Sequence, residues 1–554
     1  MSSKLKKTVS NNKVNSTQSL KAGIMKIMQY AASVYVIALL CGLPLYMERK
    51  YLNMGDAKYH FFQYVSIAML GFLIVFAAQL VYINTKDNVY NKQMLKTLSA
   101  TDWCVLAFAV ISVLSCIFAH YKRYAIFGYS GWNMGLISQL IFVLIFFFIA
   151  RFYKWNDKIM HAAIAVGGFV FLIAVLQRFD IDILNLYSNR HENGEYVRLD
   201  DIYIEKFVST LGQTSWYSSY AVLILPFGMY TYIFAKSKKQ GILSALFLIL
   251  GAASLCTVNS DSAYIAIFLI FLVFFWFALN KNESMLRFLE IVLLFIGTFR
   301  IIGLLQNLFP ERMVHLISGE EKLTRFINHS PIVLFLFVMI LIIYLFIRWR
   351  MSEEGIMGTT FDISRVAFLG DVAVWAFVVA VWLVLLLMIM VTKHTLPEWL
   401  SRFYDIGFLN FDESWGNYRG FNWRMAVRAF SEAGLKDKLI GVGPDSFAWS
   451  MDAYCKEEVA EFWHGLQLAC AHNEWLNMLI TEGILGAVAY LGIFITAARR
   501  LGAKASENKL AIPCLAAILA YISYNFFCYQ TCLCTPYIFM IIGIGEGLLR
   551  KKDI

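Results

Sequence analysis

Long apolar stretches, separated by short polar segments, run along almost the whole chain. Each is about 20 residues long, which is the length of a helix that spans a membrane. In lipid, backbone polar groups find partners only within helices or closed barrels, so we expect an all-α, polytopic transmembrane helix bundle. A window of about 19 residues indicates about 14 spans. They lie near residues 24–47, 62–84, 102–120, 133–151, 158–177, 216–236, 240–258, 262–280, 285–305, 330–349, 368–392, 475–497, 510–528 and 533–549.

The connections between these stretches alternate between basic and less basic along the chain. Lysine and arginine are retained on the cytoplasmic side of a membrane, so the basic connections mark that side. With a cytoplasmic N-terminal tail, every second connection is basic, and an even number of spans returns the C-terminus to the cytoplasm. We therefore expect both termini there. The basic residues include Lys86, Arg151, Lys154, Lys236, Lys238, Lys239, Arg348, Arg350, Arg499, Arg500 and Arg550.

This topology divides the chain into five regions. A polar, basic and poorly ordered cytoplasmic tail is expected at 1–22, followed by N-terminal transmembrane helices at 23–177. Central transmembrane helices with outer loops follow at 178–392, and a large extracytoplasmic loop follows at 393–474. C-terminal transmembrane helices and a short cytoplasmic tail complete the chain at 475–554.

The segment 393–474 is by far the longest polar stretch between spans. Loops longer than about 15 residues are usually functional or disordered. Disorder is disfavoured because apolar residues recur at helical spacing from Arg419 to Ala433. We therefore expect short helices in this loop and place the chemistry of the protein there. Anchoring at the membrane surface is the alternative role for its tryptophans, Trp399, Trp415, Trp423, Trp449 and Trp463.

Composition agrees with a membrane protein and excludes other classes. Hydrophobic residues make up 59% of the 554 residues and charged residues only 16%, against about a quarter in soluble domains. The net charge of +10 lies in short connections rather than in a compact basic domain, so no nucleic-acid partner is expected. The ten cysteines show no paired CxxC spacing with histidines, so no metal site is expected. Cys455 and Cys470 share the large loop, where an oxidising compartment would allow a disulfide.

The most specific local pattern closes the large loop. It reads Ala471-His472-Asn473-Glu474-Trp475 and is followed by Gly483 and Gly486. On one helix entering the membrane, a single face would carry His472, Leu476, Leu479, Gly483 and Gly486. Small residues at this spacing let a neighbouring helix approach closely. The pKa of a histidine at the outer membrane surface suits general-base catalysis, and a histidine that caps a helix is the structural alternative.

Arginines and glycines complete the large loop. Arg419 and Arg424 lie in the amphipathic stretch, and arginine binds diphosphates in a bidentate manner. An ordinary solvated or headgroup-contacting helix face is the alternative for these arginines. The segment Gly441-Val442-Gly443-Pro444 resembles a phosphate-binding loop only superficially, because it lacks the Lys-Ser/Thr pair and the strand–loop–helix context of nucleotide sites. A tight turn at Gly441 and Gly443 is the better interpretation.

Taken together, these residues resemble the O-antigen ligase/polymerase superfamily of polytopic membrane glycosyltransferases. His472-Asn473, nine further residues and then Gly483-x-x-Gly486 match the signature of that family. An Arg-x-x-x-Trp element (Arg419, Trp423) and a Gly-Val-Gly-Pro-x-x-Phe element (441–447) precede it in the family order. The resemblance covers roughly residues 177–494 and is strongest near the end of that range.

A further similarity lies upstream of the large loop. The segment from Thr210 to Tyr217 is similar to the Gly-Asn-Pro-Asn-Tyr segment of the family. In it, Gln213, Thr214 and Ser215 replace the usual Asn, Pro and Asn. The outer loop at 178–217 is therefore expected to supply the second half of the site.

The resemblance implies a reaction and roles for these residues. Enzymes of the family transfer a glycan from undecaprenyl diphosphate to an acceptor hydroxyl on the outer face of the bacterial cytoplasmic membrane. His472 is then the catalytic residue, and Arg419 and Arg424 bind the diphosphate. Arginines stabilise the charge that develops on a leaving diphosphate, so neither a metal nor another cofactor is expected. The motif or structural residues are Asn473, Gly483, Gly486, Gly441, Gly443, Gln213 and Ser215.

One departure from the family pattern concerns the diphosphate. The family commonly has a Ser-Arg pair at the outer end of a mid-chain span, where the arginine is proposed to bind the diphosphate. The corresponding stretch here reads Asn259-Ser260-Asp261-Ser262, with an aspartate in place of the cation. We expect the contact to come instead from Arg419, Arg424 or Arg312.

The expected partners are an undecaprenyl-diphosphate-linked glycan donor, a glycan, lipid or protein acceptor, and membrane lipids. The family contains both ligases and polymerases, and the sequence leaves these two activities open. The alternative from another class is a lipid-linked oligosaccharide flippase or other polytopic transporter. Such a protein would have charges within the membrane or broken helices in repeated halves. The chain shows no convincing internal repeat, and its long polar loop favours the enzyme.

Overall fold

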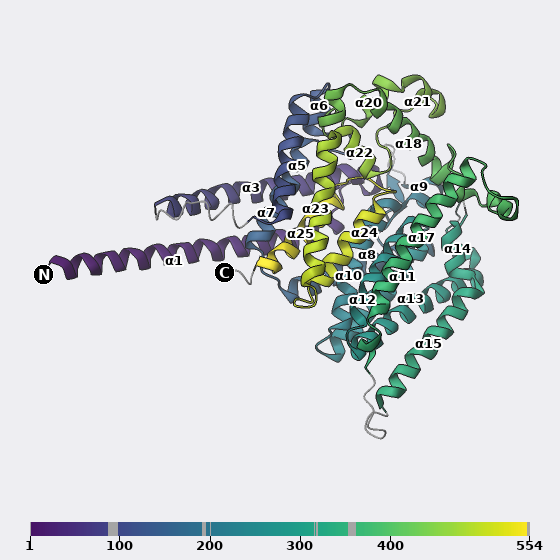
Figure 1. Cartoon of the computed structure of the whole chain (residues 1–554), viewed down its shortest axis with the longest axis horizontal. Coiled ribbons are helices and arrows are strands. Elements are labelled where there is room, and N and C mark those ends of the chain that lie inside the picture. Colours follow the sequence, from purple (N-terminus) through teal and green to yellow (C-terminus); the bar gives the residue numbers. More distant parts are fainter. Residues whose placement is uncertain are drawn as a thin grey trace.

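The chain folds into a bundle of helices with very little sheet (Figure 1). This computed structural model describes residues 2–86, 98–190, 196–199, 201–314, 316, 319–352 and 362–550. Two short antiparallel pairs are the strands of this part of the chain: β1 (Ser188–Arg190) with β2 (Tyr196–Arg198), and β3 (Phe207–Val208) with β4 (Gly212–Gln213). The fold is nearly all-α, as the sequence predicted.

Nine helical segments of the described chain are long and apolar enough to cross a membrane. They form where the sequence is continuously apolar, because a helix satisfies every backbone polar group without water. They comprise all or most of the following elements: α1 (Ser2–Ile37, from Ser19) with its π-turn η1 (Ala38–Gly42) and α2 (Leu43–Leu45), η2 (Lys50–Asn53) with α3 (Met54–Lys86, to Ile83), α5 (Ala100–Ile117), α8 (Asp157–Arg178), α11 (Lys238–Thr257), α13 (Asn282–Leu308), α15 (Pro331–Ser352, to Met351), η4 (Ile363–Val366) with α17 (Phe368–Thr392), and α23 (Gly483–Lys504).

Five further helices occupy the remaining apolar stretches. Three of them are apolar helices of 10–17 residues: α7 (Leu136–Phe152), α12 (Ser262–Ala278) and α24 (Ala511–Tyr524). The other two are α10 (Thr214–Ile233) and α25 (Thr535–Arg550). Every expected span therefore coincides with helix, while the count of about 14 spans stays a prediction.

The first helix begins earlier than the sequence suggested. α1 starts at Ser2, inside the segment 1–22 that we expected to be a cytoplasmic tail, and the place of this segment on the cytoplasmic side stays a prediction. Once a span has nucleated a helix, each added residue costs little free energy, and the lysines of the tail have good helix propensity. α1 and α3 pack against each other and extend away from the other helices (Figure 1).

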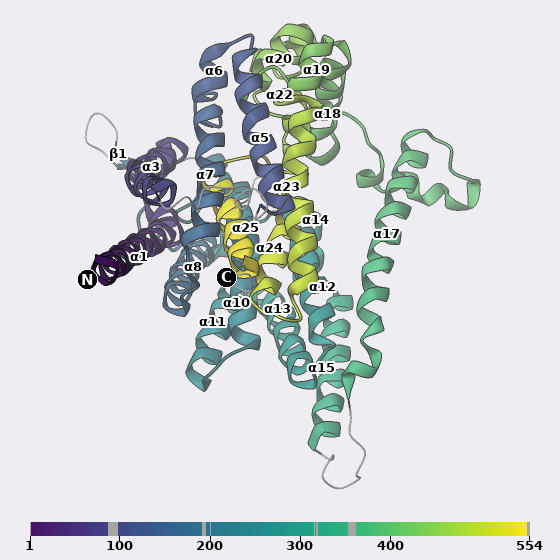
Figure 2. The ribbon, with the colours of Figure 1, turned by 60° about the vertical axis from the view of Figure 1, so that its left-hand side comes forward.

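The large loop folds into short helices at one end of the bundle, and residues 415–462 are called the loop domain from here on (Figure 2). Phe421, Met425 and Ala429 of its longest helix are buried, which confirms the amphipathic pattern. They form a separate small core with Phe447 and Met451. The helices are η5 (Glu398–Asp405), η6 (Gly407–Leu409), α18 (Trp415–Glu432), α19 (Leu435–Ile440), α20 (Phe447–Tyr454) and α21 (Lys456–Phe462).

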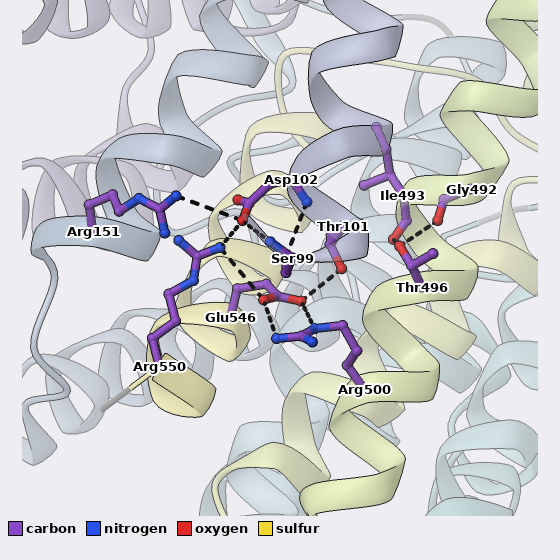
Figure 3. Close-up of polar contacts among 10 residues, drawn as sticks. All are labelled: Ser99, Thr101, Asp102, Arg151, Gly492, Ile493, Thr496, Arg500, Glu546 and Arg550. Carbon is purple, nitrogen blue, oxygen red and sulfur yellow. Dashed lines mark hydrogen bonds and ion pairs between the residues drawn. The ribbon is translucent and has the colours of Figure 1, made fainter. Parts of the chain in front are cut away.

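Buried charges join four helices at the other end of α5 (Figure 3). Asp102 of α5 and Glu546 of α25 are both fully buried. Asp102 pairs with Arg550, while Glu546 pairs with Arg500 of α23 at 2.8 Å and accepts a hydrogen bond from Thr101 at 2.7 Å. Arg151 of α7 approaches Asp102 at 3.7 Å. Paired in this way, the carboxylates tolerate burial and fix the helices to one another.

Candidate functional site

His472 lies just before α22 (Glu474–Thr481) rather than within it. The side-chain oxygen of Asn473 accepts hydrogen bonds from the backbone N–H groups of Trp475 and Leu476, at 3.0 and 3.1 Å. Asn473 is thus the N-cap of α22, a position that asparagine favours. His472 has a φ of 50°, and Gly483, with a φ of 68°, separates α22 from α23. The predicted single helical face from His472 to Gly486 is therefore wrong, because the cap and the glycine interrupt the helix.

Gly441 and Gly483 bring two backbone segments into direct contact. An added Cβ on Gly441 would lie 2.1 Å from the carbonyl oxygen of Thr481, and one on Gly483 would lie 2.4 Å from the carbonyl carbon of Leu439. The two backbone N–H groups that follow Gly441 donate to carbonyls at the end of α22, at 3.2 and 3.0 Å. Gly441 and Gly443 have φ values of 80° and 119°, which glycine alone adopts without strain. This tight turn fixes the end of α22 against the loop domain.

Gly486 serves a different contact. An added Cβ at Gly486 would lie 2.3 Å from the Cβ atom of Glu482 and 3.4 Å from a side-chain carbon of Ile111 in α5. α23 and α5 pack along this line. The two glycines of the signature thus have separate structural tasks: Gly483 meets the end of α19 and the turn at Gly441, and Gly486 meets α5.

Asp445 holds the loop between α6 (Lys122–Phe127) and α7. Its carboxylate accepts hydrogen bonds from the backbone N–H groups of Tyr129 at 2.7 Å and Met134 at 2.9 Å. Burial raises the pKa of Asp445 to about 7 in spite of these hydrogen bonds, which lower it. The loop that it holds carries Trp132, which forms one wall of the site.

Tyr529, between α24 and α25, is where the separate sequence elements meet. Its ring centroid lies 5.2 Å from that of His472 and 4.0 Å from that of Trp132. Its hydroxyl donates to Oε1 of Gln213 at 3.0 Å and accepts from Nε1 of Trp216 at 3.3 Å. His472 and Gln213 therefore share one buried neighbour. No motif pointed to Tyr529, and its place in a short loop near a membrane surface was the only available hint.

Ser215 lies at the start of α10, two residues after Gln213. Its carbonyl oxygen accepts a hydrogen bond from the hydroxyl of Tyr524 at 2.8 Å. Tyr524 ends α24, so this contact ties the start of α10 to the segment that carries Tyr529. The outer segment around residue 213 and the His472 segment are thus joined through α24.

The surroundings of His472 keep its imidazole neutral. Burial and the nearby charge of Arg419 lower the pKa of His472 to about 4. The ring makes no hydrogen bond to any residue that the structure describes, and its near neighbour is the Tyr529 ring. A neutral imidazole offers one nitrogen as an acceptor, which is the form needed to take a proton from a hydroxyl.

Of the two arginines expected to bind diphosphate, only Arg419 influences His472. Its guanidinium donates to the carbonyl oxygens of Gly416 at 2.6 Å and Phe527 at 2.9 Å. Its Nε is buried without a partner among the described residues. Arg424 is exposed and pairs with Glu413. The structure thus brings Arg419 towards His472 and engages Arg424 elsewhere.

The carboxylate of Asp261 is engaged in hydrogen bonds within the protein. Its carboxylate accepts hydrogen bonds from the backbone N–H groups of Leu323 and Thr324, both at 2.9 Å, at the start of α14 (Lys322–His329). Negative charge at a helix N-terminus is stabilising, so the aspartate has a physical reason to stand here. Arg312, in η3 (Pro310–Arg312), is exposed and has no carboxylate partner among the described residues. Burial and the charge of Asp261 raise the pKa of nearby Glu321, while the charge of Arg419 opposes them.

Glu474 is a buried carboxyl two residues after His472. Its Oε1 accepts from the Tyr490 hydroxyl at 2.6 Å, and its Oε2 accepts from the Tyr521 hydroxyl at 3.0 Å and from Nδ2 of Asn525 at 2.8 Å. Burial raises the pKa of Glu474 to about 8, although the tyrosine hydrogen bonds lower it. These contacts fasten the start of α22 to α23 and α24. Glu474 belongs to the motif, but its place in the sequence indicates no role for it.

A small cavity lies between these groups, with a volume of about 20 Å³, which is room for about one water molecule. Its lining includes Trp132, Asp445, Glu474, Asn477 and Tyr529. In the part of the chain that the structure describes, no three histidine, cysteine, aspartate or glutamate side chains gather to hold a metal ion. Cys455 and Cys470 are free, buried thiols, so the disulfide that the sequence allowed is not formed.

Comparison with known families adds an independent line of support. A search of curated proteins gives no match to the chain. Residues 323–491 match the O-antigen ligase family, and this range contains most of α14, the loop domain, His472 and both glycines of the signature. The match confirms the resemblance of the chain to the O-antigen ligase superfamily, whose members are membrane glycosyltransferases of polysaccharide biosynthesis.

Proposed function

We propose that the protein transfers a glycan from a polyprenyl diphosphate to an acceptor hydroxyl at the outer face of the bacterial cytoplasmic membrane. The observation that carries this proposal is a half-buried, neutral His472 whose pKa is lowered by burial and by the charge of Arg419, with both residues in the matched family region. In this proposal the loop domain lies outside the cytoplasm and the basic connections lie inside. Undecaprenyl diphosphate is the donor carrier that the family resemblance favours.

The reaction requires one bond to form and one to break. The acceptor oxygen attacks the anomeric carbon of the donor sugar, and the bond from that carbon to the diphosphate oxygen breaks. His472 takes the proton of the acceptor hydroxyl through the free nitrogen of its imidazole. Arg419 stabilises the negative charge that develops on the diphosphate, and its buried Nε supplies a donor that has no partner among the described residues. Attack from the side opposite the leaving group inverts the anomeric centre.

The neighbouring residues position these two groups. Asn473 starts α22 and thereby fixes the backbone on which His472 stands. Tyr529 packs edge-on against the imidazole and links it to Gln213. Arg424, with its partner Glu413, lies on the exposed side of α18, where we propose that it meets the donor before Arg419 does.

The test is a substitution at His472 with a matched histidine elsewhere in the loop. His472→Ala should lower the transfer rate by about 10²- to 10⁴-fold, the usual contribution of a general base. His464→Ala, at an exposed position, should leave the rate unchanged. The assay incubates purified protein with a polyprenyl-diphosphate-linked glycan and follows the product by gel or mass spectrometry. Transfer by His472→Ala at the wild-type rate, in protein that is inserted and folded, would refute the role of His472 as base.

The same assay separates the two activities of the family. A ladder of products without added acceptor indicates a polymerase, and a single product that depends on the acceptor indicates a ligase.

A further inference from the structure

A sizeable cavity lies at the end of the bundle opposite His472. Its volume is about 180 Å³, against about 20 Å³ for the cavity beside Tyr529. Gln213 and Phe234 bracket the two ends of α10, and its 20 residues place those ends about 30 Å apart. The cavity touches Phe234, whereas Gln213 contacts Tyr529. It is therefore far from the proposed reaction centre.

The inner part of this cavity is apolar, while Asn280, Ser284 and Ser506 add polar groups to its lining. The end of α10 supplies Ile233, and Phe234 follows directly after it. α12 supplies Phe274 and Phe277, and the start of α24 supplies Ile512. An apolar cavity of this size excludes ordered water and binds hydrocarbon instead. A hydrocarbon segment is therefore the favoured occupant of its inner part.

The rim of the cavity carries positive charge. Lys281 immediately precedes α13, and Lys509 lies just before α24. The Nζ atom of Lys509 lies 4.8 Å from the centroid of the Phe234 ring. Neither lysine has a carboxylate partner among the residues that the structure describes. Both ammonium groups are thus available to an anion at the mouth of an apolar cavity.

The position of the cavity fits a membrane lipid. α10 and α12 end here and α13 and α24 begin here. In the proposed topology, helices leave the hydrocarbon for the headgroup region at this level. Basic pockets between transmembrane helices at this depth bind anionic lipid headgroups. We propose that the cavity binds an anionic phospholipid, with the phosphate between Lys281 and Lys509 and an acyl segment against the phenylalanines.

The test is lipid binding to the purified full chain, followed by native mass spectrometry. Phosphatidylglycerol and phosphatidylcholine with identical acyl chains are titrated in parallel, and the wild type should prefer phosphatidylglycerol. Lys281→Gln with Lys509→Gln should weaken phosphatidylglycerol binding about 30-fold, or about 5-fold for each lysine. Lys238→Gln with Lys239→Gln is the matched control, because these exposed lysines lie at the same end of α10 and outside the cavity. The control pair should bind like the wild type.

Two further measurements separate the headgroup from the acyl chain. Glycerol phosphate, which has the anion without the chains, should not displace phosphatidylglycerol. Ala278→Leu fills part of the cavity and leaves both lysines in place, so it should also weaken binding. Unfolding temperatures confirm that each variant is folded. Equal phosphatidylglycerol affinity in the wild type and the Lys281/Lys509 pair, or displacement by glycerol phosphate, would overturn the proposal.

Discussion

Replacing Glu474 tests whether its buried carboxyl fixes the start of α22, next to His472, against α23 and α24. Its two oxygens accept from the hydroxyls of Tyr490 and Tyr521 and from the amide of Asn525, at distances from 2.6 to 3.1 Å. Glu474→Ala removes the acceptor for all three groups, and each buried group left without a partner costs about 1–3 kcal/mol. Tyr490 retains a hydrogen bond from Gln530, so the expected loss of stability is about 3–5 kcal/mol in total.

Glu474→Gln is the matched variant, because it preserves the shape and one acceptor oxygen. The amide nitrogen of the glutamine is a donor, and it faces a hydroxyl or amide group that donates to Glu474 in the wild type. Losing one hydrogen bond in this way costs about 1 kcal/mol. Burial raises the pKa of Glu474 to about 8, against an ordinary value near 4.5, so the folded wild type holds a proton that the unfolded chain releases as the pH rises above 4.5. Wild-type stability should therefore fall by up to about 1.4 kcal/mol per pH unit between pH 5 and pH 8, relative to the glutamine variant.

Unfolding is followed with a thiol-reactive fluorophore, since most of the free cysteines are buried in the folded protein. Melting curves of the wild type, Glu474→Gln and Glu474→Ala are recorded from pH 5 to pH 8. Identical pH dependence of the wild type and the glutamine variant would refute the raised pKa. An alanine variant as stable as the wild type would refute the hydrogen-bond network itself.

Three further substitutions test other contacts, each by the same unfolding measurement. Gly483→Ala should lower stability by about 2 kcal/mol or more, because the φ of Gly483 is 68° and the added Cβ would lie 2.4 Å from a backbone atom. Gly434→Ala is the control and should change stability little, because nothing lies within 4 Å of an added Cβ there. Asp261→Ala should cost about 1 kcal/mol through the lost N-terminal contact of α14, and an unchanged melting temperature would contradict that role. Arg500→Ala should lower the free energy of unfolding by roughly 2 kcal/mol. This is less than for a fully buried ion pair, because Arg500 is partly exposed. A stability equal to that of the wild type would show that Glu546 finds another partner.

The helices of the bundle could be predicted because hydrophobicity and backbone hydrogen bonding alone determine where a span forms. α15 and α17 illustrate this, since each coincides with an expected apolar stretch. The amphipathic spacing of Phe421, Met425 and Ala429 likewise predicted a helix, because a small core needs one apolar face. These features depend on residues close in sequence.

The break between α22 and α23 could not be predicted, because it depends on a partner distant in sequence. Gly483 adopts its positive φ where the turn at Gly441 packs against it, and the sequence shows only two glycines. The roles of Tyr529 and Asp261 could not be predicted for the same reason. Tyr529 gains its position from contacts with Trp132 and Gln213, and Asp261 gains its position from the start of α14.

The backbone contact between Gly441 and Gly483 also bears on the order of assembly. The segment 439–443 belongs to the loop domain, whereas residue 483 opens the next membrane helix. The loop domain is synthesised before α23, so its turn at Gly441 can pack against Gly483 only after the start of α23 has been synthesised. His472, between the two, acquires its orientation only when both are in place. The backbone on both sides of His472 is therefore completed only after most of the membrane helices have been synthesised.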